Sequence, residues 1–69
     1  MPTNLERYHA IAERLGAATW DGLFDWDVGP ILSRNGITLR LSPKIFDFNE
    51  DDALVAMAER EFARAASDT

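Results

Sequence analysis

The chain lacks most of the residues that stabilise or activate very small proteins. It has 69 residues, no cysteine and one histidine, His9. Disulfide bonds are therefore excluded, and a structural zinc site is disfavoured because its usual sulfur and nitrogen ligands are missing. No apolar run approaches the roughly 20 residues of a membrane span, and the N-terminus lacks signal-peptide features. We therefore expect a cytoplasmic protein without membrane contact, held together by packing or by association.

Catalytic and metal-binding motifs are also missing. There is no G-x-S-x-G motif, and the glycines are scattered singly instead of forming a phosphate-binding loop. A calcium loop beginning at Asp47 would need glycine at its sixth position and glutamate at its twelfth, where the chain has Asp52 and Ala58. We therefore predict that the protein is not an enzyme and that it binds no metal or other cofactor.

Positive charge is scarce. Twelve acidic residues face seven basic ones, which gives a formal net charge of −5. This balance disfavours direct nucleic-acid binding and anionic membranes, because both require clustered lysine and arginine. A larger protein with a basic surface is the natural partner if the charge is functional. Alternatively, the charge only keeps a small protein soluble.

What is present is the composition of a globular domain, with 46% hydrophobic and 28% charged residues. We expect one domain, residues 1–69. Thr3 and Glu6 have capping-box spacing, and apolar residues recur with helical period as far as Leu15, before Gly16. This pattern predicts a helix over Asn4–Leu15. A second stripe predicts a helix over Glu50–Ala66, with Asn49 as its N-cap.

Between these helices the sequence favours extended structure. Phe24, Trp26 and Val28 alternate with aspartates, as in a half-buried strand, although a short helical turn containing Trp20 and Phe24 remains an alternative. Asn35-Gly36 is typical of a hairpin turn. The alternation over Ile37–Leu41 predicts a strand, and Ile45–Phe48 resembles a short third strand, with Phe46 and Phe48 inward. The predicted fold is therefore α+β: an N-terminal helix, an antiparallel hairpin or three-stranded sheet, and a C-terminal helix packed on it.

Two acidic clusters flank the predicted hairpin and could form one surface. We interpret them as the binding site of a non-catalytic protein-interaction domain, with Trp20 as an aromatic anchor. The narrower hypothesis is an inhibitor that mimics nucleic acid on a basic surface, as phage anti-defence or anti-CRISPR proteins can do. Ordinary solvated faces are the alternative interpretation of the clusters. The predicted partner-binding residues are Trp20, Asp21, Asp25, Asp27, Asp47, Glu50, Asp51 and Asp52.

A structural role is the second hypothesis. Two tryptophans are difficult to bury completely in so short a chain, and Met57 falls outside the apolar stripe of the C-terminal helix. Exposed aromatic and thioether groups are common at contact surfaces. The chain would then be a small assembly adaptor, or a homodimer, that associates through apolar contacts around Trp20 and Met57.

Overall fold

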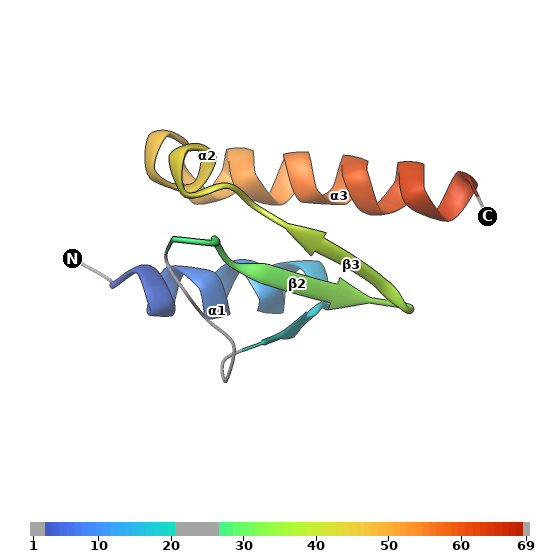
Figure 1. Ribbon diagram of the computed structural model, residues 1–69, viewed down its shortest axis with the longest axis horizontal. Helices are drawn as coiled ribbons and strands as arrows, with labels where there is room; N and C mark the ends of the chain where they lie inside the picture. Colours follow the sequence, from blue (N-terminus) through green and yellow to red (C-terminus); the bar gives the residue numbers. More distant parts are fainter. Residues whose placement is uncertain (1–2, 21–26, 69) are drawn as a thin grey trace.

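The computed structural model describes residues 3–20 and 27–68, and its elements confirm the α+β prediction (Figure 1). In chain order the elements are α1 (Asn4–Leu15), β1 (Ala18–Thr19), β2 (Ile31–Arg34), β3 (Ile37–Arg40), α2 (Pro43–Phe48) and α3 (Asp51–Ser67).

The limits of α1 follow from local signals in the sequence. The Glu6 amide donates to the Thr3 side chain over 3.1 Å, and the Thr3 hydroxyl donates to the Glu6 carboxylate over 3.2 Å. Gly16 ends the helix with φ 63°, and its amide donates to carbonyls of the last turn. Left-handed backbone is unfavourable for residues with a Cβ, so glycine is the preferred residue there. The predicted bounds Asn4–Leu15 are confirmed.

The three strands form one antiparallel sheet in the order β1-β2-β3. Leu32, in the middle strand, lies opposite Thr19 on one side and Leu39 on the other, and it is fully buried. Asn35 and Gly36 form the predicted turn with φ 54° and 80°, as a two-residue hairpin requires. The two-residue strand β1 was not predicted, because two residues carry no readable alternation.

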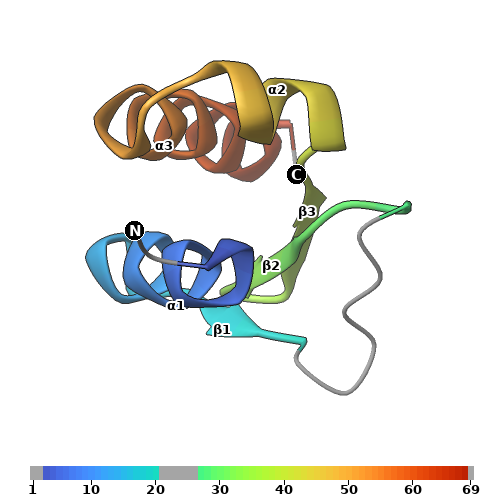
Figure 2. The ribbon, with the colours of Figure 1, turned by 90° about the vertical axis from the view of Figure 1, so that its left-hand side faces the viewer.

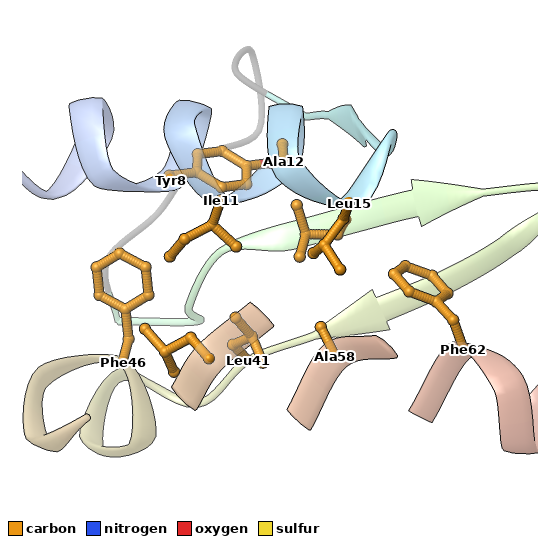
Figure 3. Packing of buried hydrophobic residues seen from close by; sticks show 10 residues of the cluster. Tyr8, Ile11, Ala12, Leu15, Leu41, Phe46, Ala58 and Phe62 are labelled. Atoms are coloured by element: carbon orange, nitrogen blue, oxygen red, sulfur yellow. The ribbon is translucent and has the colours of Figure 1, made fainter. Parts of the chain in front are cut away.

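Helices α1 and α3 lie on the same side of the sheet (Figure 2). Apolar side chains of both helices belong to one buried cluster. Figure 3 shows Ile11 and Leu15 of α1 pointing towards the side where Phe46 of α2 and Ala58 and Phe62 of α3 lie. Phe46 and Ile11 are fully buried. The buried Tyr8 hydroxyl donates to the Ile31 carbonyl and accepts from the Trp20 amide, so it joins α1 to the ends of β1 and β2.

Residues Pro43–Phe48 form a helix, so the prediction of a third strand over Ile45–Phe48 was wrong. The Ile45 amide donates to the Ser42 side chain over 3.1 Å, and Pro43 occupies the first turn, where its missing N–H has no cost. Helical geometry places residues two apart on nearly opposite sides. Phe46 is accordingly buried, whereas Phe48 points outward and is 82% exposed.

Three further expectations were wrong. Asn49 is the C-cap of α2, where its side chain donates to the Ile45 carbonyl over 2.9 Å, and Glu50 precedes α3 as its N-cap.

Val28 is 43% exposed and lies in a turn, not inward in a strand. Phe24 and Trp26, the other residues of that predicted strand, lie outside the described residues. Met57 is half-buried against the core instead of outside the stripe of α3.

Gly29 permits a close backbone contact between the segment before β2 and the segment after β3. Its φ is 101°, and a Cβ at this position would lie 1.9 Å from the Leu41 carbonyl oxygen. The Leu41 amide donates to the Pro30 carbonyl over 2.9 Å, so the two segments are also hydrogen-bonded. Only glycine fits this crossing, because any side chain would collide with main-chain atoms of Leu41.

We predict that Gly29→Ala lowers the free energy of unfolding by at least about 2 kcal/mol, because it adds a backbone collision to an unfavourable φ. Gly36→Ala is the matched control. Its φ is 80° but open space surrounds it, so that change should cost only about 1 kcal/mol. Urea unfolding followed by circular dichroism measures both. Equal losses in the two variants would contradict the assignment of a close contact to Gly29.

Candidate functional site

Two acidic residues of the predicted partner surface are joined to α1 by ion pairs. The Arg7 Nε donates to the Asp51 carboxylate over 2.9 Å, and the Arg14 guanidinium donates to Asp52 over 2.7 Å. Arg7 also donates to the Asn49 carbonyl over 3.0 Å. The first turn of α3 therefore directs part of its negative charge at α1, where it holds the two helices together.

The Arg7 guanidinium also stacks on a core ring. Its carbon lies 4.4 Å from the centre of the Phe46 ring, and its side chain is only 19% exposed. Cation–π contact of this kind is stronger when partly desolvated. The Arg7 side chain thus covers the core, contacts the face of the Phe46 ring and donates to the Asn49 carbonyl at the end of α2.

Arg34, at the end of β2, repeats this arrangement at the other end of α3. Its guanidinium lies 4.6 Å from the Phe62 ring centre, donates to the Leu15 carbonyl over 2.9 Å, and forms a two-pronged pair with Glu59 at 2.8 and 3.3 Å. The hydrogen bond from Arg34 is the main cause that lowers the pKa of Glu59, and the same bond raises the pKa of Arg34. Sequence reasoning missed this pair, because 25 residues separate its members.

Among the residues that the structure describes, the most exposed large apolar side chain is Phe48, at the junction of α2 and α3. We define the α2–α3 corner surface as Ile45, Asp47, Phe48 and Glu50. Ile45 is 42% exposed and lies one helical turn before Phe48, which is 82% exposed, so the two share one side of α2. Asp47 and Glu50 are exposed beside them, and neither forms an ion pair with the described residues. The surface therefore combines an aromatic group with unpaired carboxylates.

The other predicted site residues are distributed over several places. Asp21 and Asp25 lie outside the described residues, and Asp27 is exposed shortly before Gly29, whose backbone contacts Leu41. Trp20 is 37% exposed and follows β1. Strand β1 and helix α2 lie at opposite sides of the molecule in both ribbon views (Figures 1 and 2). The described structure therefore does not bring Trp20 together with Asp47 and Glu50.

No motif for chemistry emerges from the part of the chain that the structure describes. Over residues 3–20 and 27–68, no three histidine, aspartate or glutamate side chains gather as a metal-binding group. None of the helices in these ranges combines the length and apolar character needed to cross a membrane. Comparison with protein-family models, curated proteins and solved structures gives no significant match to the chain. Its function is therefore inferred from its own surfaces.

The Arg34–Glu59 pair predicts a specific dependence of stability on pH. The pKa of Glu59 is lower in the folded chain than its ordinary value of 4.5. The ionised Glu59 carboxylate therefore contributes fully to the free energy of unfolding above that ordinary value, and this contribution is lost as the pH falls through the lowered pKa. Glu59→Gln should reduce the loss of stability between about pH 7 and about pH 3, measured by urea unfolding at each pH.

Arg34→Gln is the matched variant for this test. It leaves the Glu59 carboxylate in place but removes the guanidinium that lowers its pKa, so it should remove the same acid-dependent step. An unchanged pH dependence in both variants would mean that the pair does not contribute to folding.

Proposed function

We propose that this protein is a non-catalytic protein-binding domain that docks on a larger protein through the α2–α3 corner surface. The observation that carries the proposal is the 82% exposure of Phe48, in a chain whose Tyr8, Phe46 and Phe62 are at most 2% exposed. The fold itself has no need of an aromatic ring at this position. A partner that covers the Phe48 ring would gain the free energy of burying apolar surface that remains exposed in the folded chain.

The size of this gain is sufficient for an anchor residue. Full burial of a phenylalanine side chain stabilises by about 1.5–3 kcal/mol, and Ile45 on the same side of α2 would add to it. Interfaces concentrate their binding energy in a few such groups, surrounded by polar residues that exclude water. Asp47 and Glu50 occupy that surrounding position here, next to the exposed ring.

The charge of the surface favours a basic partner. Asp47 and Glu50 carry negative charge at the corner, against one exposed cation on the same helix, Lys44. The whole chain carries −5, and a field of this sign speeds encounters with positively charged surfaces. The narrower form of the proposal is a cytoplasmic inhibitor that occupies a nucleic-acid-binding surface, as an anti-CRISPR-like mimic. Its support is the net charge together with the two unpaired carboxylates.

An assembly adaptor or homodimer is the second candidate, and the Ile45–Phe48 pair favours it. Two exposed apolar side chains on one side of a short helix are suited to association without any charge preference. The two candidates differ in their response to salt, because screening weakens attraction between exposed charges but not the burial of apolar groups.

Phe48→Ala should weaken binding to the partner by about tenfold or more, because it removes the proposed anchor. The partner is first captured from nuclease-treated native lysate and identified by mass spectrometry, and affinities are then measured by calorimetry. Leu5→Ala is the matched control, because Leu5 is 44% exposed on α1 and lines a hollow whose other residues, Glu6, His9, Ala10 and Glu13, all belong to α1. Equal affinities for Phe48→Ala and the unmodified protein would contradict the proposal.

The double variant Asp47→Asn/Glu50→Gln should flatten the dependence of affinity on salt, since it removes the two unpaired carboxylates of the corner. Glu13→Gln/Asp68→Asn removes two exposed carboxylates elsewhere and serves as the control. A steep salt dependence retained in the corner variant would favour the adaptor. Displacement of the partner's own nucleic acid by the unmodified protein would support the inhibitor.

A further inference from the structure

Strand β3 has an edge that the described chain leaves unpaired. The Leu41 amide bonds to the Pro30 carbonyl, which makes Leu41 and Pro30 a hydrogen-bonded pair of the antiparallel ladder. Such pairs alternate with non-bonded ones, so Leu39 bonds to β2, whereas Thr38 and Arg40 direct their backbone N–H and C=O groups away from it. Within residues 3–20 and 27–68, these outward groups of Thr38 and Arg40 have no backbone partner.

A groove runs along this edge, between β3 and α3. One hollow of about 370 Å³ is lined by Leu39, Leu41, Ile45 and Met57, together with Arg40, Arg60 and Glu61. A second hollow of about 330 Å³ continues along the strand. It is lined by apolar residues, Ile37, Leu39, Phe62 and Ala65, and by polar or charged ones, Thr38, Glu61, Arg64 and Asp68. Leu39 belongs to both hollows. An open strand edge bounded by a helix, with two hollows in line, matches the way sheets receive an extended peptide.

The side chains of the groove indicate the chemistry of such a peptide. The wall of the first hollow is mainly apolar, so it suits an apolar side chain of an added strand. The second hollow has a mixed polar and apolar wall and receives the side chain two residues along the same strand. Arg60 is exposed at the first hollow and forms no ion pair with the described residues, whereas Glu61 is already bonded to Arg64. Excess positive charge at this point, in a chain of net charge −5, favours a carboxylate on the occupant.

We propose that the groove between β3 and α3 binds an extended segment of a partner protein, which adds to the sheet as a fourth strand next to β3. Its main chain pairs with the outward groups of Thr38 and Arg40. An apolar side chain fills the first hollow, the side chain two residues along enters the second, and an acidic side chain beside the first hollow pairs with Arg60. The groove shares Ile45 with the corner surface. The edge of β3 and Arg60 lie outside that surface, so the proposal does not depend on the function proposed above.

A second copy of the chain is the competing occupant, through pairing of β3 with β3. The sequence of this strand, Ile37-Thr38-Leu39-Arg40, contains a cation and no carboxylate. It therefore lacks the acidic group that Arg60 would bind, and it would bring further positive charge to the groove. The charge pattern favours a different chain that carries an acidic residue.

The test uses a phage-displayed library of random peptides, selected on the unmodified protein and counter-selected on Arg60→Glu. We expect peptides with an apolar residue that fits the first hollow and an acidic residue beside it. The best peptide should lose about tenfold or more in affinity, measured by fluorescence anisotropy, towards Arg60→Glu and towards Thr38→Pro. Proline at position 38 removes an outward N–H and leaves the bonds to β2 in place. On binding, the amides of Thr38 and Arg40 should become protected from hydrogen exchange.

Lys44→Glu is the matched control, because it makes the same charge change on α2 outside the lining of the groove. Peptide binding should survive this change and Phe48→Ala. Circular dichroism establishes that each variant is folded, and Arg60→Glu, at an exposed position, keeps the test decisive if Thr38→Pro unfolds. No selected peptide, equal binding to Arg60→Glu, or protection of Thr38 that rises with protein concentration alone would each overturn the proposal.

Discussion

One apolar layer carries the stability of this chain. Helices α1 and α3 bury their stripes against each other and against one face of the sheet, and Leu32 on the middle strand is completely enclosed. A chain of this length buries only about 60% of its unfolded surface, and it has no cysteine to cross-link it. Every other element is arranged to complete this layer: α2 adds Phe46, and the Tyr8 hydroxyl satisfies the polar groups beside it.

Two arginines extend the layer to its edges. Arg7 and Arg34 each stack on a buried phenylalanine, donate to a main-chain carbonyl and pair with a carboxylate of α3. Because long cationic side chains bury their methylene groups while their charged ends reach solvent, they can cover a core that is too small to enclose itself. The consequence for function is that Asp51 and Asp52 have structural partners, whereas Asp47 and Glu50 have unpaired charge at the corner surface.

The sequence predicted those features whose causes lie within a few residues. Thr3, Glu6 and Gly16 delimit α1 through local hydrogen bonds and a left-handed cap, and Asn35-Gly36 determines a turn by its φ values. Ser42-Pro43 contained an equally local signal, an N-cap followed by proline in the first turn. The alternation of Phe46 and Phe48 was given more weight than this signal, so a strand was predicted where the chain forms a helix, and Phe48 was assigned to the core.

The remaining features depend on contacts across the chain. The Arg7–Asp51 pair joins residues 44 positions apart, and no periodicity reveals which acids of a charged first turn will find such a partner. The groove beside β3 likewise arises only when α3 packs next to the strand. The composition led only to the hypothesis of an interaction protein with an acidic surface, whereas the exposure of Phe48 and the open edge of β3 become visible only in the fold.

The same hairpin that leaves an edge open also orders the assembly of the chain. Strands β2 and β3 meet across a two-residue loop, so their contacts close at the smallest cost in chain entropy, whereas the contacts of α1 with α3 close a loop of 44 residues at Arg7–Asp51. Local pairings form fastest because they restrict the fewest intervening residues. By this reasoning the β2–β3 hairpin forms first, and the packing of α1 against α3, which closes the longest of these loops, comes last.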